Sequence, residues 1–322
     1  MRYIGSQEVA DSLPYDELVE SLRKIYQVDG MSARRDLINL KELTGADGTC
    51  MALMSAWGPD HDLTAKIFTL FPTNREKGLP TIHAIIFVFD ATNGSLKAVV
   101  DGTEVTRRRT ACMSALAADY LARQDSRQLL VCGAGALAPH AALAHASVRP
   151  IERIEVWARR EEAAESVVEN LQSQRADLEI GVATNLAEAC RRADIVTSQT
   201  SSPNPIIFGD WITPGTHLDF VGSHDPNKRE CDDEAVRISK IYVDVLETAM
   251  REAGDILIPL NSGVISKAHI VGDLSDLTRR IVTGRTSDEE ITLFKSTGSS
   301  LADLAAAELV VKNAARVVDN QA

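Results

Sequence analysis

One short segment constrains the fold of this 322-residue chain more than any other. The apolar run 129–132 ends in a Gly-x-Gly-x-x-Ala motif, and a helical pattern of small residues follows over 138–146. This is the strand, tight turn and helix start that hold a dinucleotide pyrophosphate: the first glycine permits the turn, the second lets the backbone approach the phosphates, and the helix N-terminus faces their charge. The motif therefore predicts a cofactor-binding loop made of Gly133, Ala134, Gly135, Ala136 and Leu137.

The end of the next predicted strand, 154–157, bears on which dinucleotide would bind. A cofactor with a free 2′-hydroxyl is usually held there by a carboxylate. In this chain Ala158 stands at that position and is followed by Arg159 and Arg160. Guanidinium groups suit a 2′-phosphate, which a carboxylate would repel. The sequence thus favours NADP(H), with NAD(H) left open and two solvated surface arginines as the alternative interpretation.

Length and composition narrow the class of protein. A chain of 322 residues is long for one core and suggests two domains. The net charge of −12 argues against nucleic acid or an anionic membrane as partner. The five cysteines are scattered without C-x-x-C spacing, which indicates neither a disulfide framework nor a metal site. The N-terminus has no signal-peptide pattern and no apolar run approaches the length of a membrane span, so a cytoplasmic protein is expected.

The first part of the chain reads as an α+β domain. Residues 15–28 carry apolar side chains at helical spacing, and from about residue 50 to 105 the period becomes two, which indicates antiparallel strands. A turn is expected at Asp101 and Gly102, and a helix over 110–123 that leads to the next domain. The strands are expected at 63–71, and at 82–90 and 96–100 as a hairpin across Asn93 and Gly94.

From residue 128 onward, strand and helix patterns alternate, which predicts a Rossmann-type, doubly wound parallel sheet. The fold class is therefore α/β with an added α+β domain. In the tail, 300–318, Asp303 follows Ser300 by three residues, which is typical of a capped helix. Further strands are expected at 129–132, 154–157, 179–183, 195–197, 217–221 and 241–245, and helices at 161–172 and 186–192.

Further motifs follow one another along the chain. They are Lys66-Ile67 before 71–74, the segments 106–111 and 114–117, the Gly133 turn, 221–223 with Arg229 and Glu230, Val243-Asp244, and 294–298. In this order, and over essentially the whole length, they resemble the ornithine cyclodeaminase/mu-crystallin family. That family includes cyclodeaminases, alanine dehydrogenases, and reductases of cyclic ketimines and other small imino acids.

The resemblance implies a homodimer with a two-part fold. One part is an NAD(P)-binding Rossmann domain, which we place at residues 119–298. The other is a substrate-binding and dimerisation domain, which we place at residues 1–118 and which the C-terminal helix 299–322 completes.

The resemblance also implies which residues bind the ligands. Arg34, Lys66 and Arg109 match the cations that clamp a small carboxylate, because hydride transfer needs both reactants in near-attack geometry. Arg35 is the alternative to Arg34, since Ser32 replaces the family's proline. Lys66 could instead be a snorkelling lysine, and Arg109 could belong to a solvated run of arginines. Cofactor contacts are expected in addition from Thr200, Val221, Ser223 and Gly298.

The residue after segment 221–223 discriminates between the family's activities. Cyclodeaminases carry an aspartate there as proton acceptor, whereas this chain has His224, with Asp225 one residue later. A histidine near its ordinary pKa suits proton transfer beside an imine. Packing on the cofactor is the alternative role for His224, and the change argues against ornithine cyclisation.

These residues predict an NAD(P)H-dependent reductase of a small imino acid that gives an L-amino acid. The favoured substrate is a cyclic ketimine carboxylate such as Δ1-pyrroline-2-carboxylate, with Lys66 and His224 as the catalytic pair. Three alternatives stay open: a reductase or dehydrogenase of an acyclic imino acid of the iminosuccinate or alanine type, ornithine cyclodeaminase, and a non-catalytic binding protein like the mu-crystallins. An extra cation for a second carboxylate would favour iminosuccinate, and Arg35 or Arg108 could supply it.

Overall fold

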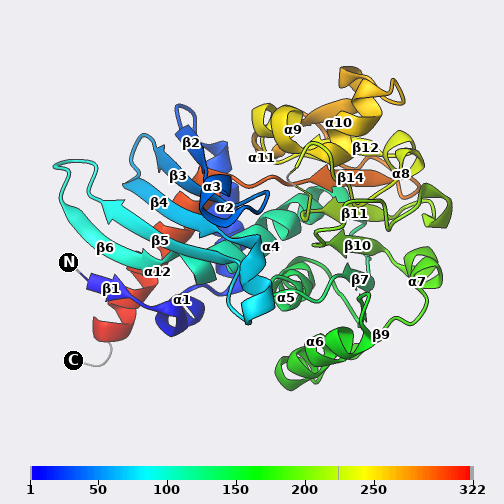
Figure 1. The fold of residues 1–322 in the computed structure, drawn as a ribbon, viewed down its shortest axis with the longest axis horizontal. Helices are drawn as coiled ribbons and strands as arrows, with labels where there is room; N and C mark the ends of the chain where they lie inside the picture. The colour runs from blue at the N-terminus through cyan, green and yellow to red at the C-terminus, as the bar shows by residue number, and fades with distance from the viewer. Residues whose placement is uncertain (1, 224, 320–322) are drawn as a thin grey trace. The chain divides into compact units, whose positions relative to one another are not determined.

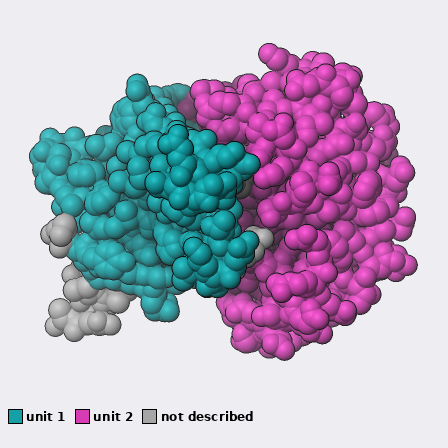
Figure 2. Space-filling model, in the orientation of Figure 1, with its two compact units in different colours: residues 1–109, 299–322 teal, residues 110–298 magenta. Residues whose placement is uncertain are grey.

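The computed structural model describes residues 2–223 and 225–319, which form two compact units (Figure 2). Unit 1 comprises residues 1–109 and 299–322, and unit 2 comprises residues 110–298. The division at 109/110 falls inside helix α4 (Gly102–Leu121), which also contains the boundary at 118/119 that we expected. A single helix therefore carries the chain from the first unit into the second.

Unit 1 is built on a six-stranded sheet in the order β1-β6-β5-β4-β3-β2, in which β1 pairs parallel to β6 and the other pairs are antiparallel (Figure 1). The predicted strand and hairpin are confirmed, whereas β1 and β2 were not predicted. Most of β2 is exposed, so its sequence lacks the apolar alternation that marks a half-buried strand. The strands are β1 (Arg2–Ile4), β2 (Ser32–Asn39), β3 (Cys50–Trp57), β4 (Leu63–Leu70), β5 (Ile82–Phe89) and β6 (Leu96–Asp101).

Helices cover one face of this sheet. The C-terminal helix α12 (Ser300–Asp319) packs across strands β2 to β6, and α2 (Tyr15–Gln27) packs on α12. Both helices agree with the predicted ranges. The buried face of α2 carries Leu18, Leu22 and Ile25. The short helices are α1 (Ser6–Ser12), α3 (Lys41–Thr44) and a 3-10 turn at Pro72–Lys77.

The start of α4 differs from expectation. The helix begins at Gly102, eight residues before the predicted start at residue 110. The Asp101-Gly102 pair is the N-terminal cap of this helix, because the Glu104 amide donates to Asp101 Oδ1 at 2.8 Å. Gly102 is also required by packing, since a Cβ there would lie 2.8 Å from the carbonyl carbon of Ala84. The residues that we expected to form a turn, Asp101 and Gly102, therefore form the start of a helix.

Unit 2 holds an eight-stranded parallel sheet in the order β13-β12-β14-β11-β10-β7-β8-β9 (Figure 1). The run β9-β8-β7-β10-β11 is the Rossmann order, so the predicted fold class is confirmed. The six predicted strands are present, and β13 and β14 were missed. The strands are β7 (Gln128–Cys132), β8 (Arg153–Trp157), β9 (Glu179–Val182), β10 (Ile195–Ser198), β11 (His217–Phe220), β12 (Lys240–Val243), β13 (Ile270–Asp273) and β14 (Thr292–Lys295).

Both faces of the parallel sheet are buried. In β7, Leu129 and Val131 join one apolar cluster, and Leu130 and Cys132 join another. This is why the strands read as continuous apolar runs. Among the described residues, no helix has the length and apolar character needed to cross a membrane. The helices are α5 (Ala138–Val148), α6 (Glu161–Gln174), α7 (Leu186–Arg192), α8 (Asp233–Arg237), α9 (Leu246–Glu252), α10 (Gly254–Asn261) and α11 (Leu274–Thr278), with 3-10 turns at Gly209–Trp211 and Lys267–His269.

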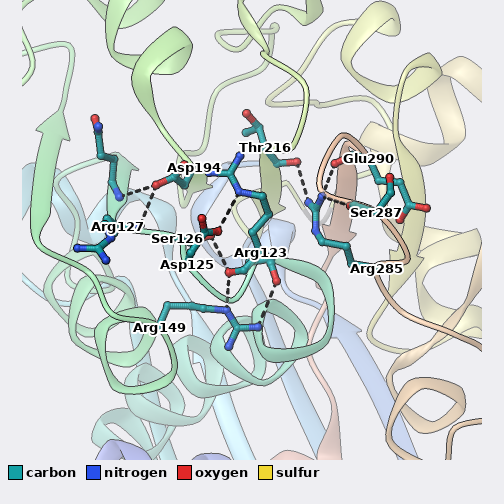
Figure 3. Close-up of polar contacts among 12 residues, drawn as sticks. Arg123, Asp125, Ser126, Arg127, Arg149, Asp194, Thr216, Arg285, Ser287 and Glu290 are labelled. Carbon is teal, nitrogen blue, oxygen red and sulfur yellow. Dashed lines mark hydrogen bonds and ion pairs between the residues drawn. The ribbon is translucent and has the colours of Figure 1, made fainter.

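Three arginines anchor the N-terminal ends of these parallel strands (Figure 3). Arg149 donates to carbonyls in the last turn of α4 and just after it, including Arg123 O at 2.9 Å. Arg285 donates from Nε to Leu121 O at 2.7 Å and from Nη1 to two further carbonyls. Arg123 pairs with Asp194, which directly precedes β10. These guanidinium groups fasten the helix end to the sheet.

Candidate active site

In unit 1, two of the predicted clamp residues meet at a shared carboxylate. Lys66 lies on β4, Arg109 on α4 and Asp303 on α12. Lys66 Nζ and Arg109 Nε each donate to Asp303 Oδ1 at 2.9 Å. All three side chains are buried, with exposed fractions of 2%, 6% and 1%. The cluster carries two cations and one anion, so the net charge of these three side chains is +1.

Burial and charge set the protonation of this cluster. Burial lowers the pKa of Lys66 to about 8, although the charge of Asp303 opposes that shift. Burial also disfavours the ionised form of Asp303, but the charges of Lys66 and Arg109 outweigh it and hold its pKa below the ordinary value. At neutral pH both side chains are therefore charged. Among the described residues, Asp303 Oδ2 has no hydrogen-bond partner.

Asp303 is the member of this cluster that the sequence analysis did not predict. We expected it to cap the C-terminal helix, but its Oδ1 accepts from the two cations and its Oδ2 accepts no hydrogen bond in the described part of the chain. A sequence signal was present, because Asp303 interrupts the apolar run from Ala302 to Ala307, whose residues are buried. A lone carboxylate in such a run requires a cationic partner.

The strand register separates the two candidate arginines of β2. Arg35 is opposite Met54, which is opposite Lys66, so Arg35 shares the face of Lys66. Arg34 is opposite Ser55, on the other face, and is exposed. The positive charge of Arg35 contributes to the lowered pKa of Lys66. The structure thus brings Arg35, and not Arg34, to the side of the sheet that carries Lys66.

Arg108, the other candidate for an extra cation, is engaged elsewhere. Its Nε donates to Glu104 Oε1 at 2.8 Å, and its Nη1 donates to the carbonyl of Leu13 at 3.1 Å. The guanidinium also lies 5.1 Å from the ring centre of Tyr15, within the range of a cation–π contact. Arg108 therefore has a structural role beside Arg109, the predicted clamp residue.

In unit 2, the predicted dinucleotide loop has the required shape. Gly133 follows β7 with φ of +119°, and its amide donates to Trp157 O at 2.8 Å. Gly135 and Ala136 are exposed, and a Cβ at Gly135 would meet no atom within 4 Å. Helix α5 begins at Ala138, immediately after Leu137. A turn that only glycine adopts easily, open space above Gly135 and a helix N-terminus fit a pyrophosphate.

The ribose-reading position follows β8 as expected. Ala158 is half-buried, whereas Arg159 and Arg160 are exposed, and Arg160 is the N-cap residue of α6. No carboxylate occupies the strand end at 158–160. The two guanidinium groups are accessible to a ligand.

Two buried carboxylates hold the loops at the C-terminal ends of the strands. Asp244 Oδ2 accepts from the amides of Thr297 at 2.7 Å and of Gly298 at 2.6 Å. Gly298 has φ of +94°, so this turn requires a glycine. Glu230 accepts from both the amide and the hydroxyl of Thr200. Both acids occur in the motifs noted in the sequence, but no role was predicted for them.

The remaining predicted residues lie in the segment that follows β11. The amide of Val221 donates to Ser198 O at 2.9 Å, and Ser223 is buried with its hydroxyl donating to Lys228 O. His224, the predicted proton-transfer residue, lies outside the described residues.

The sheet order and the glycine loop define a Rossmann-type dinucleotide-binding protein. The chain belongs to the ornithine cyclodeaminase/mu-crystallin family, whose model matches residues 36–317. The resemblance read from the sequence motifs is thereby confirmed.

Relatives and solved structures extend over nearly the whole chain. The Δ1-pyrroline-2-carboxylate reductase of Paracoccus denitrificans is 37% identical over 312 residues, covering 97% of this chain and 96% of that protein. The structure of Thermococcus litoralis Δ1-pyrroline-2-carboxylate reductase in complex with NADH and L-proline is similar with a TM-score of 0.93, at 31% identity and 98% coverage of both chains. An archaeal alanine dehydrogenase dimer with bound NAD has a TM-score of 0.89 at 28% identity, covering 98% of this chain and 96% of that one.

Proposed function

We propose that this protein is an NAD(P)H-dependent imine reductase that acts on a cyclic ketimine carboxylate such as Δ1-pyrroline-2-carboxylate and gives an L-amino acid. The buried cluster of Lys66, Arg109 and Asp303 carries the proposal, because its one surplus positive charge suits one substrate carboxylate. Similarity to two reductases of this substrate supports the same assignment.

In the proposed reaction, the imine takes up one hydride and one proton and becomes the amine. The reduced nicotinamide supplies the hydride when it is bound. Lys66 and Arg109 bind the substrate carboxylate and orient the ring, and Arg35 adds positive charge on the same face of the sheet. Lys66, whose pKa is about 8, can also release a proton near neutral pH. His224 is the second candidate for the proton donor.

One observation favours a second substrate class, imino acids with two carboxylates. Arg35 lies on the Lys66 face, so a second carboxylate, as in iminosuccinate, would find a cation there. Arg108 does not serve this purpose, since its guanidinium is held by Glu104, by the carbonyl of Leu13 and by the ring of Tyr15. Ornithine cyclisation is disfavoured because His224 replaces the aspartate expected of a cyclodeaminase.

A substrate panel tests the proposal. Cofactor oxidation would be followed with Δ1-pyrroline-2-carboxylate, its six-membered homologue, iminopyruvate and iminosuccinate, and ammonia release with L-ornithine. We expect the two cyclic ketimines to have the highest kcat/KM and L-ornithine to release little or no ammonia. Rapid, NAD-dependent conversion of L-ornithine to proline, or a clear preference for an acyclic imine, would contradict the proposal.

We infer further that NADP(H) is the preferred pyridine nucleotide. The support is positive charge at Arg159 and Arg160 without a carboxylate at Ala158. Ala158→Asp should shift the preference toward NADH by repelling the 2′-phosphate. Steady-state constants for both cofactors test this, and a tenfold preference of the unmodified enzyme for NADH, about 1.4 kcal/mol in the opposite direction, would contradict it.

We also infer a homodimer that forms through the face of the unit 1 sheet opposite α12. Alternating residues of β3, β4 and β5 place apolar side chains on that face; among them are Leu53, Trp57, Ile67, Ile85 and Phe87. A contiguous apolar face of this kind favours association. The dimeric alanine dehydrogenase supports the same inference.

Light scattering after size exclusion measures the oligomeric state. We expect a dimer for the unmodified protein and a monomer for Phe87→Glu, because a charge in the interface would be desolvated. Ile281→Glu is the matched control, since Ile281 is an exposed apolar residue of unit 2. A monomeric unmodified protein, or a dimeric Phe87→Glu variant, would contradict the inference.

A further inference from the structure

Four hydrogen-bond donors converge on one buried carboxylate in unit 2. Glu230 Oε1 accepts from Ser198 Oγ at 2.6 Å, from the Thr200 amide at 2.7 Å and from Thr200 Oγ1 at 2.8 Å. Glu230 Oε2 accepts from the Gly222 amide at 2.6 Å. The side chain is fully buried. One carboxylate therefore joins the segment after β10 to the segment after β11.

Packing independently shows that these two segments are in direct contact. A Cβ on Gly222 would lie 1.8 Å from Thr200 O and 2.4 Å from the Thr200 nitrogen. Gly222 is not among the glycines with positive φ, so close approach and not backbone conformation demands glycine here. The carboxylate and the glycine act on the same junction.

The backbone of Glu230 is held as well. The Glu230 amide donates to Asp255 Oδ1 at 2.7 Å, and Asp255 Oδ2 lies 3.0 Å from Lys295 Nζ. Lys295 belongs to β14 and Asp255 to α10, and both are fully buried. Asp255 therefore links the backbone of Glu230 to the end of β14.

We propose that Glu230 is a positioning residue for the nucleotide: by closing the segments after β10 and β11 on each other, it sets the placement of the predicted cofactor contacts Thr200, Val221 and Ser223. The proposal rests on the proposed cofactor and is independent of the proposed substrate. If Glu230 were protonated, one carboxyl oxygen would carry a hydrogen, and one of the four donors that point at the carboxylate would lose its acceptor. Because an unsatisfied buried donor is costly, the junction would loosen.

The environment of Glu230 makes this junction sensitive to pH. Burial raises the pKa of Glu230 to about 7, while Lys295 lowers it and Asp255 raises it further. The thiols of Cys132 and Cys231 also face the carboxylate, and burial holds their pKa values well above the ordinary range. The thiols and Lys295, whose pKa is also raised, do not titrate near neutrality. Affinity for the nucleotide is therefore expected to fall as the pH drops through about 7.

The test is the dissociation constant of NADH without substrate, measured by quenching of tryptophan fluorescence across this pH range. NADH is the probe because it lacks a 2′-phosphate, which would itself titrate near pH 6. We expect Glu230→Gln to raise the dissociation constant about tenfold or more at alkaline pH, since the amide cannot accept from all four donors. The same variant should lose the pH dependence.

Ser198→Ala gives a second, milder variant. It removes one donor that lowers the pKa of Glu230, so the midpoint of the pH dependence should move upward. Glu290→Gln is the matched control at the opposite end of the sheet, where Glu290 accepts from the Thr286 amide, the Thr286 hydroxyl and Lys240. It should bind NADH as the unmodified protein does.

Parent-like NADH binding by Glu230→Gln would overturn the proposal, and so would a pH dependence that survives in that variant. If Glu230→Gln yields no folded protein, the midpoint of Ser198→Ala decides: an upward shift supports the proposal and an unchanged midpoint overturns it. Because no imine is present, failure of the substrate assignment leaves this test unaffected.

Discussion

Two groups of buried or half-buried cations in this molecule differ in what accepts their hydrogen bonds. At the N-terminal ends of the unit 2 strands, Arg149 and Arg285 donate mainly to backbone carbonyls (Figure 3). In unit 1, Lys66 and Arg109 both donate to one oxygen of Asp303. The first arrangement provides donors for carbonyls that have no intrahelical partner at the end of a helix. The second leaves one carboxylate oxygen without a partner among the described residues and one positive charge in excess.

This difference shows that burial alone does not mark a binding cation. A guanidinium that saturates carbonyls is part of the scaffold, because any ligand would have to replace those acceptors. A pair of cations that shares a single carboxylate retains attraction for a second anion. The comparison makes opposite predictions for the two groups, one on stability and one on catalysis.

The largest effect is expected from Arg149→Ala. This change leaves several α4 carbonyls and Asp119 without their donor, so the free energy of unfolding should fall by about 3 kcal/mol. Urea unfolding measures it, with the exposed Arg251→Ala as a control expected to change stability by about 0.5 kcal/mol or less. The kcat/KM of the folded protein should stay at the parent value. If Arg149→Ala lost catalysis without losing stability, the distinction between structural arginines in unit 2 and binding cations in unit 1 would be wrong.

The next effect is expected from Arg109→Ala, compared with Arg108→Ala. Loss of a charged, buried hydrogen bond to the substrate carboxylate costs roughly 1.5–3 kcal/mol, so kcat/KM should fall tenfold or more. Arg108 is held by Glu104 and the carbonyl of Leu13, and its removal should leave kcat/KM close to the parent value. Equal kcat/KM values for both variants would show that Arg109 is not a clamp residue.

The smallest effect is expected from Asp303→Asn, and it concerns pH. Lys66 must be protonated to bind a carboxylate, so kcat/KM should fall as the pH rises through about 8. The charge of Asp303 raises the pKa of Lys66, and its removal should move this alkaline limb downward by about one pH unit. Glu104→Gln, which removes a buried carboxylate that binds Arg108, should leave the limb in place. If the alkaline limb of the pH profile does not move in Asp303→Asn, the titration of Lys66 does not produce that limb.

The dinucleotide loop and the clamp differ in how far sequence could predict them. The loop is a contiguous segment in which glycines and an apolar strand carry the signal, and its geometry at Gly133 and Gly135 agrees with the prediction. The clamp joins Lys66 to Asp303 across 237 positions, and only the packing of α12 on the sheet brings them together. Sequence alone does not supply that contact.

Strand register sets a second limit. Arg34 and Arg35 are adjacent, so they point to opposite faces of β2, but only the pairing of Arg35 with Met54, and of Met54 with Lys66, shows which one shares the Lys66 face. Glu230 was visible in a motif, yet its four donors come from the ends of β10 and β11. Residues whose contacts come from segments distant in the sequence can be identified only once the fold is known.

The central claim is that Lys66 and Arg109 recognise the carboxylate of a cyclic imine, and one comparison tests it most directly. The kcat/KM would be measured for Δ1-pyrroline-2-carboxylate and for Δ1-pyrroline, which lacks the carboxylate, in the unmodified enzyme and in Arg109→Ala. We predict a preference for the carboxylate of about a hundredfold or more in the unmodified enzyme, which falls at least tenfold in the variant, because only the carboxylate substrate loses a partner. A ratio near one in the unmodified enzyme, or an unchanged ratio in Arg109→Ala, would contradict the claim.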